Sequence, residues 1–253
     1  MLITGTLKLP KKTDWAIILS VGINQMTLYI LFVSTGLLYI NANRGAILGY
    51  ITPLFVIPIS YFVLRQKPTL WTICGFLIGM IGVIVMFNPL ELDLSTSNTI
   101  QGSIFVITAA FFWAINIIFI RSYRHDFSSF QLLPWQLLTA SILLFLFAWY
   151  EEPDFNLWFD DIDFKSILIL IFTGVFGTGY GFWAAVKLNR MLDANTLSMC
   201  MLLIPISGFI FSILLLGESI LLSNVIGLIS ILVGIIISMG DKLKLKKTKQ
   251  HDR

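Results

Sequence analysis

The side chains that could do chemistry inside the apolar stretches of this chain are amides, hydroxyls and aromatic rings. Asn24 and Tyr29 lie in the first stretch, and Tyr50 lies in the second. Trp113 and Asn116 are three residues apart, so they share one face of a helix. Such groups can bind a solute through hydrogen bonds and ring faces. They provide no acid or base for proton transfer.

These polar side chains have two interpretations. An Asn or Gln that faces lipid is costly, so it should point toward a cavity or a neighbouring helix. In the first interpretation the side chains line a substrate cavity. In the second, the amides join helices and the aromatic rings lie at the membrane interfaces. Both interpretations stay open for the cavity candidates, which are Asn24, Tyr29, Tyr50, Trp113, Asn116, Tyr180 and Trp183.

Catalysis and metal binding are disfavoured by the same inventory. Six of the 14 acidic residues cluster in the polar segment 151–163, and a loop of this kind is usually solvated. Cys74 and Cys200 lie in apolar runs without a nearby His, so they form neither a disulfide framework nor a zinc site. We therefore expect a protein that is not an enzyme and that has no catalytic residue, no metal site and no cofactor.

The composition of the chain indicates whether it folds in water or in a lipid bilayer. Of its 253 residues, 57% are hydrophobic and only 12% are charged, whereas a soluble domain has about 25% charged residues. This composition excludes a soluble enzyme, a disordered protein and a secreted disulfide scaffold. The net charge of +3 is too small to indicate a nucleic-acid partner. The lipid bilayer is the expected partner.

Eight stretches are long and apolar enough to cross a bilayer, which needs about 20 residues of helix. No alternation typical of strands runs through them, which disfavours a barrel. We therefore predict an all-α integral membrane protein, a bundle of about eight transmembrane helices. The stretches are 15–38, 45–64, 69–88, 101–120, 130–150, 166–186, 195–217 and 221–240.

The positive charges predict the orientation. If eight helices cross, 15 of the 17 Lys and Arg residues fall on one side, and such an excess marks the cytoplasm. Both the N-terminal segment 1–14 and the basic tail 241–253 are then cytoplasmic, and the acidic segment 151–163 is outside. The prediction is a multi-pass protein of a bacterial inner membrane.

The chain also matches itself when it is shifted by 152 residues. Without a gap, 11 of 74 positions are identical between 15–88 and 167–240. The weight comes from rarer residue types, which pair Gly22 with Gly174, Pro53 with Pro205, Gly75 with Gly227 and Gly82 with Gly234. Two more spans lie between the copies, so the second unit is a five-helix repeat over 101–240.

An odd number of helices in each unit turns one unit upside down relative to the other. The first unit, 15–88, then has three helices and lacks its first two. Inverted repeats around a site near the bilayer midplane are typical of secondary transporters. Pro53 and Pro205 lie in equivalent spans, where each removes a backbone donor, and they are candidate hinges.

The ordered pattern of these residues resembles the EamA-type (RhaT-like) repeat of the drug/metabolite transporter superfamily. The second copy carries it as Asp193-Ala194-Asn195, Pro205, Leu216-Gly217-Glu218, Gly227 and Gly234. The first copy has Asn41-Ala42-Asn43 and Pro53, but Gln66 where the family has Glu. The resemblance covers about 15–240.

The resemblance implies a permease, exporter or exchanger of a small organic metabolite, such as an amino acid or a related solute. Access to the site would alternate between the two sides of the membrane. A cavity without fixed charge would suit a neutral, zwitterionic or aromatic solute. The alternative is a truncated carrier fragment that is inactive, or that works only by pairing with a copy of itself as a homodimer.

Overall fold

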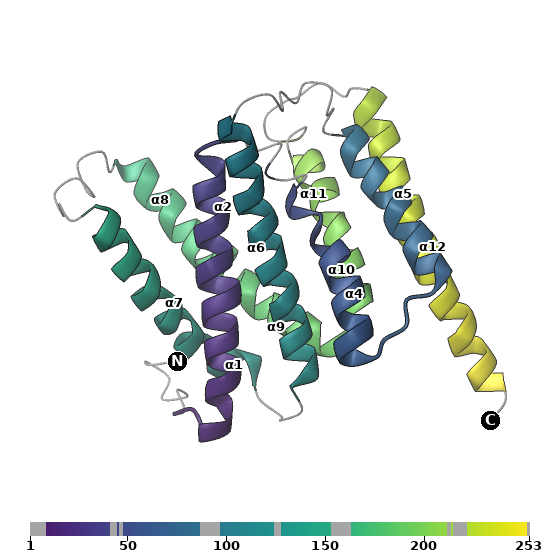
Figure 1. Cartoon of the computed structure of the whole chain (residues 1–253), viewed down its shortest axis with the longest axis horizontal. Helices are drawn as coiled ribbons and strands as arrows, with labels where there is room; N and C mark the ends of the chain where they lie inside the picture. The colour runs from purple at the N-terminus through teal and green to yellow at the C-terminus, as the bar shows by residue number, and fades with distance from the viewer. Residues whose placement is uncertain are drawn as a thin grey trace.

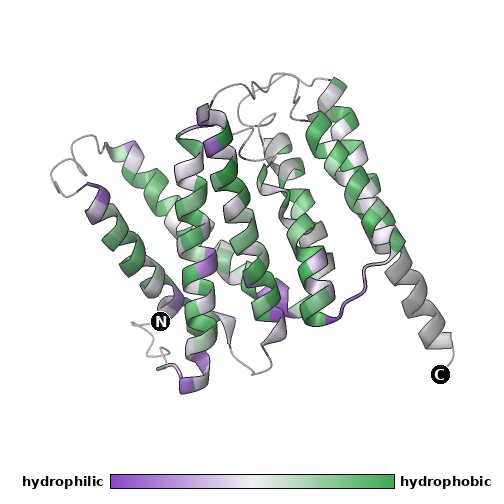
Figure 2. Cartoon of the chain, in the orientation of Figure 1, coloured by the Kyte–Doolittle hydropathy of each residue, from purple (hydrophilic) through white to green (hydrophobic). Residues whose placement is uncertain are grey.

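The computed structural model describes residues 9–40, 45, 48–86, 97–123, 128–152, 163–211, 214 and 222–251. Over these residues the chain is helical and contains no strand. The helices lie side by side with similar tilts (Figure 1), and apolar residues run along nearly their whole length (Figure 2). The prediction of an all-α membrane protein is confirmed.

The N-terminal part forms one long rod and two further helices. In the rod, an α-helix changes to a π-helix and back without a break. The elements are η1 (Lys12–Asp14), α1 (Trp15–Ser20), the π-helix η2 (Val21–Leu28), α2 (Tyr29–Leu37), α4 (Thr52–Leu64) and α5 (Leu70–Met86).

The C-terminal part begins with two long helices. The Ser128 side chain caps α7, and Asp163 caps α8 by accepting a 2.7 Å hydrogen bond from the Ser166 backbone N–H. Hydrogen bonds from Ser166 hold the pKa of Asp163 below its ordinary value. The elements are α6 (Ser97–Ser122), α7 (Ser129–Glu151), α8 (Phe164–Phe172), the π-helix η4 (Thr173–Tyr180), α9 (Gly181–Met191), α10 (Ala194–Cys200), the 3₁₀ turn η5 (Met201–Leu203), α11 (Ile204–Phe211) and α12 (Leu222–His251).

Four helical runs of the described residues are long and apolar enough to cross a membrane. They are Lys12–Leu37, Asn98–Ser122, Ser129–Glu151 and Phe164–Met191. Shorter apolar helices cover Thr52–Leu64, Leu70–Val85 and Val225–Ser238. Each predicted span thus contains helix, while the number of crossings stays a prediction. Helix α12 continues beyond the predicted span 221–240, through the basic residues to His251, while its apolar part is Val225–Ser238.

The offset of 152 residues recurs in the helix boundaries. The π-helix η2 begins at Val21 and η4 at Thr173, and both contain eight residues. Three later helix starts show the same offset: Tyr29 with Gly181, Thr52 with Ile204, and Leu70 with Leu222. The sequence match therefore corresponds to a match in local backbone structure, which is what an internal repeat predicts.

The bundle is held by close helix contacts. Helix α6 lies beside α2 and α4 (Figure 1), and α5 lies along α12. A Cβ atom at Gly75 would overlap the Gly234 carbonyl, and one at Gly82 would lie 2.7 Å from the Gly227 carbonyl oxygen. Small residues let these two backbones touch, as they commonly do in membranes.

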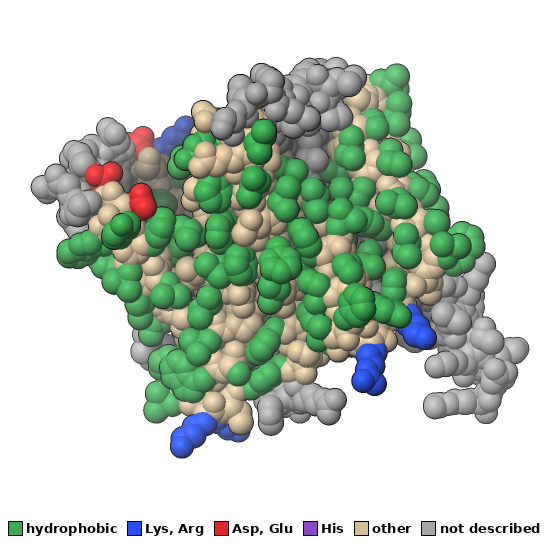
Figure 3. All heavy atoms as spheres, viewed as in Figure 1, with side chains coloured by type: hydrophobic (Ala, Val, Ile, Leu, Met, Phe, Trp, Pro, Cys, Tyr) green, Lys and Arg blue, Asp and Glu red, His purple; other side chains and the backbone are tan. Residues whose placement is uncertain are grey.

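Charged side chains lie at the ends of the bundle. Lys and Arg lie mainly along its lower edge in Figure 3, with a further patch at the upper left, where the visible Asp and Glu also lie. Both η1 and the end of α12 lie toward the lower end (Figure 1). This arrangement agrees with the uneven charge distribution along the sequence, and the cytoplasmic assignment of that end stays a prediction.

Candidate functional site

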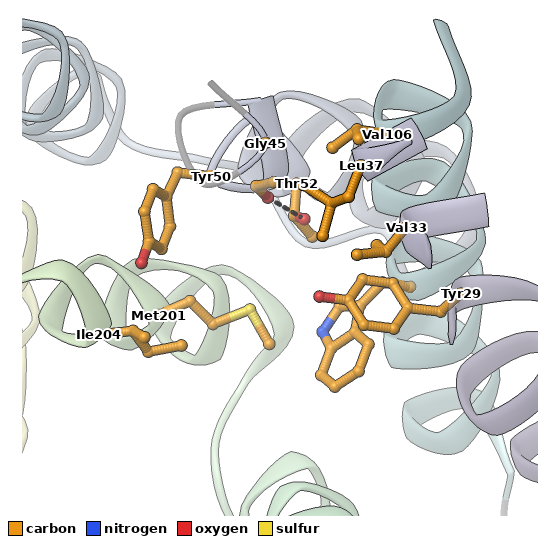
Figure 4. A pocket seen from close by; sticks show the side chains of 11 residues that line it. Tyr29, Val33, Leu37, Gly45, Tyr50, Thr52, Val106, Met201 and Ile204 are labelled. Atoms are coloured by element: carbon orange, nitrogen blue, oxygen red, sulfur yellow. Dashed lines mark hydrogen bonds between the residues drawn. The ribbon is translucent and has the colours of Figure 1, made fainter. Parts of the chain in front are cut away.

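A cavity of about 270 Å³ lies among α2, α4, α6 and the η5–α11 segment. It combines residues that are far apart in the sequence, from both predicted repeats. Figure 4 shows side chains from these elements facing a common space. The lining residues are Tyr29, Val33, Leu37, Gly45, Gly49, Tyr50, Thr52, Val106, Trp113, Met201 and Ile204.

Few polar atoms line this cavity, and they come mostly from aromatic side chains. The hydroxyls of Tyr29 and Tyr50 point toward the common space in Figure 4. The Thr52 hydroxyl donates a 2.8 Å hydrogen bond to the Gly49 carbonyl. The buried indole N–H of Trp113 has no hydrogen-bond partner among the described residues. None of the described lining residues carries a charge.

Two helix starts border the cavity at equivalent places. Helix α4 starts at Thr52 after a turn, and α11 starts at Ile204 after the 3₁₀ turn η5. Pro53 and Pro205 are each the second residue of their helix. The missing N–H of Pro53 therefore falls in a first turn, where no intrahelical partner exists. Pro205 differs, because α10, η5 and α11 follow one another without a gap and place it within a helical run. The two prolines nevertheless keep equivalent positions in their helices.

Aromatic rings form one end of the cavity. The ring centroids of Tyr29 and Trp113 are 4.7 Å apart, and those of Trp113 and Phe182 are 6.0 Å apart. Beyond Trp113 along α6, buried Ala114 and Ile117 pack with residues of α4 and α10. Trp113 therefore packs against this apolar cluster on one side and lines the cavity on the other.

An amide cluster lies one helical turn beyond Trp113, about 5 Å along α6. Ser20 donates a 3.3 Å hydrogen bond to Asn116, and the Asn116 amide donates to the Gln25 carbonyl. Asn24 donates a 3.5 Å hydrogen bond to Ser20. Gln25 and Asn116 are each only 2% exposed. For Asn24 and Asn116 these contacts favour the helix-joining interpretation.

The remaining two candidates lie apart from the cavity. Tyr180 is 62% exposed at the end of η4. Trp183, one turn into α9, packs with Tyr180 and Phe130 at centroid distances of 5.4 and 6.1 Å. The Lys187 ammonium lies 5.0 Å from the centre of the Trp183 ring, which is cation–π geometry. Neither residue lines the cavity.

The structure thus brings together three of the seven candidates, Tyr29, Tyr50 and Trp113. The sequence analysis missed the apolar wall and the small residues at the helix break. Val33, Val106 and Ile204 are ordinary residues of an apolar span, and nothing in the sequence indicated that they line a cavity. Met201 and Thr52 could have been found, because each lies within four residues of a proline that the repeat pairs.

Metal ligands do not gather in the part of the chain that the structure describes. Its residues contain no group of three or more His, Cys, Asp or Glu side chains able to hold a metal ion. Cys74 and Cys200 form no disulfide bond in this described part. The polar groups of the cavity are instead suited to holding an uncharged solute by hydrogen bonds and ring contacts.

Comparison with known proteins defines the class of this molecule. Residues 1–88 and 100–240 match the EamA-like transporter family. A solved crystal structure of another protein superposes with a TM-score of 0.77 over 94% of this chain and 81% of the other. Their sequences are 17% identical, so this likeness shows the fold alone.

Curated relatives agree with this class. An uncharacterized transporter of Clostridium kluyveri is 26% identical over 90% of this chain and 73% of its own length. The uncharacterized transporter YoaV of Bacillus subtilis is 24% identical over 82% and 70%. The uncharacterized inner membrane transporter YhbE of Escherichia coli is 24% identical over 83% and 64%.

The chain belongs to the EamA-like transporter family. It is a multi-pass membrane protein of a transporter family rather than of an enzyme family, and its solvent is the lipid bilayer. The resemblance found in the repeat is therefore confirmed.

Proposed function

We propose that this chain is a secondary transporter that carries a small organic metabolite through the cavity at Tyr29, Tyr50 and Trp113. It works in a bacterial inner membrane with both termini in the cytoplasm. The solute binds between the two predicted repeats, three helices in 15–88 and five in 101–240. Small organic metabolites of about the size of an amino acid are the first class to test.

The observation that carries the proposal is the position of the cavity at the two paired helix starts. Thr52 opens α4 and Ile204 opens α11, and both residues line the cavity. Non-helical backbone at membrane depth is tolerated where it lines a cavity or is buried in protein. Transporters with inverted repeats bind their solutes at such interruptions near the midplane.

Alternating access follows from this arrangement. In this structure the rings of Tyr29 and Trp113 contact each other, and Trp113 packs against the apolar cluster beyond it. Rocking of one repeat against the other would separate this cluster and close the opposite end. Pro53 and Pro205 are the proposed hinges, because each begins a helix that borders the cavity.

Labelling of an introduced thiol tests alternating access without knowledge of the solute. Val33→Cys is made in a background in which Cys74 and Cys200 are replaced by Ser. A membrane-impermeant maleimide is then added to right-side-out and to inside-out vesicles. We expect the introduced thiol to be labelled from both sides, because the cavity opens to each side in turn.

Ile229→Cys on α12 is the matched control. Ile229 is exposed on an apolar helix and does not line the cavity, so it should resist the reagent from both sides. Labelling of Val33→Cys from one side only would contradict alternating access. It would instead support the fragment that does not transport by itself.

A further inference from the structure

The chemistry of the cavity wall narrows the chemical class of the solute, provided that the proposed function is correct. The free polar hydrogens come from the hydroxyls of Tyr29 and Tyr50 and from the indole of Trp113. The indole N–H can only donate, and it is buried without a partner in the described structure. A buried donor without an acceptor costs free energy, so the bound solute should supply an acceptor.

Apart from the oxygens of its own hydroxyl groups, which can also accept, the described wall has few free acceptors. The Gly49 carbonyl already accepts the Thr52 hydroxyl, and the Met201 thioether is a weak acceptor. A primary ammonium brings three donors and needs acceptors, ideally a carboxylate. No Asp or Glu is among the described lining residues. The wall therefore disfavours a cationic amine.

A full anion is disfavoured for a different reason. The described lining residues include neither Lys nor Arg that could pair with a bound carboxylate. An unpaired charge in a cavity of low polarity pays a large desolvation cost. A neutral carbonyl oxygen accepts the same hydrogen bonds without that cost.

The rest of the wall is apolar and aromatic. Val33, Leu37, Val106 and Ile204 surround the space, and the Tyr29 and Trp113 rings close one end of it. This described surface suits a hydrocarbon or aromatic body and has few polar groups to hold a sugar-like ring of hydroxyls.

We infer that the transported solute is a neutral molecule with a carbonyl-type oxygen at one end and an apolar or aromatic body at the other. The oxygen accepts hydrogen bonds from Trp113 and from Tyr29 or Tyr50. The body packs against Val33, Val106 and Ile204. A free amine and a zwitterion without further acceptors in the wall bind less well than the neutral amide of the same skeleton.

Three probes of one skeleton test this inference by binding to the purified protein in lipid nanodiscs. The probes are 3-phenylpropanamide, which is neutral with a carbonyl, 3-phenylpropylamine, which is cationic without one, and phenylalanine, which is zwitterionic. We expect the amide to bind at least tenfold more tightly than the other two. Tighter binding of the amine or of phenylalanine would overturn the inference, and so would no binding of the amide.

Single substitutions test which side chains donate hydrogen bonds to the amide oxygen of the probe. Trp113→Phe keeps a ring and removes the N–H, and it should weaken amide binding five- to tenfold, the effect of one lost hydrogen bond. Trp71→Phe is the control, because Trp71 is exposed away from the cavity and should leave binding unchanged. Tyr50→Phe is a second donor variant in case Trp113→Phe folds poorly. Unchanged amide binding in the folded donor variants contradicts the proposed contact.

The two proposals fail in different ways. Two-sided labelling of Val33→Cys without binding of the amide leaves the transporter standing and rejects the solute class. Binding of the amide with one-sided labelling supports the recognition chemistry and rejects alternating access.

Discussion

The two π-helical segments η2 and η4 share a backbone conformation but have opposite surroundings. Each has eight residues, and the offset between them is the 152 residues of the repeat. In η2, five residues are buried, whereas η4 has none. Only the glycine at the second position, Gly22 or Gly174, is common to both sequences at equivalent places.

The surroundings of the two glycines explain why η2 is buried and η4 is not. A Cβ atom at Gly22 would lie 3.0 Å from the Thr139 Cβ and 3.1 Å from the Gln136 carbonyl oxygen, both on α7. A Cβ atom at Gly174 would meet nothing within 4 Å in the described structure. Helices α6 and α7 cover η2, while η4 contacts chiefly its own neighbours α8 and α9. The π-helix therefore does not depend on burial by a neighbouring pair of helices.

Substitution of these two glycines should give the largest difference in the free energy of unfolding between the two π-helical segments. Gly22→Leu forces a side chain into the contact with α7 and should lower the free energy of unfolding by about 3 kcal/mol. Gly174→Leu points into open space and should change it by less than about 0.5 kcal/mol. Thermal unfolding in detergent, followed by size-exclusion chromatography, measures both. Equal losses would mean that η4 is packed as tightly as η2.

The residues three positions further along should also differ in their effect on stability. Gln25→Ala removes the acceptor of the Asn116 amide and should cost about 1.5 kcal/mol. Gly177→Ala, its counterpart in η4, has room for a methyl group and should be neutral or slightly stabilising, because Ala favours helix over Gly. The same thermal assay applies. A destabilised Gly177→Ala variant would show that η4 needs the glycine for close packing.

The two tyrosines at the ends of these segments should differ in binding rather than in stability. Tyr29 follows η2 and lines the cavity, whereas Tyr180 ends η4 and is exposed. Tyr29→Phe should weaken binding of 3-phenylpropanamide about fivefold, the effect of one hydrogen bond. Tyr180→Phe should change it less than about twofold, because a surface substitution away from the site has little effect. Weaker binding in Tyr180→Phe would place η4 at a solute site.

The site was harder to predict than the fold for a physical reason. An Asn in an apolar span must avoid lipid, but a helix contact satisfies it as well as a cavity does. The sequence therefore made Asn116 and Trp113 equally good cavity candidates. The structure places Trp113 at the cavity and Asn116, one turn further along α6, in a contact between helices. Tyr180 shows a further limit, since a tyrosine tolerates an exposed place that an amide does not.

The sequence by itself determined the membrane environment and the helical class, and it predicted the repeat and its offset. These properties depend on composition and on local periodicity, which act on each segment separately. Tertiary structure alone decided that η2 is covered while η4 is bare. It also decided that Tyr29, Tyr50 and Trp113 meet at the starts of α4 and α11. Such outcomes depend on how each helix is rotated and which helices lie beside it, and similar apolar surfaces do not encode that choice locally.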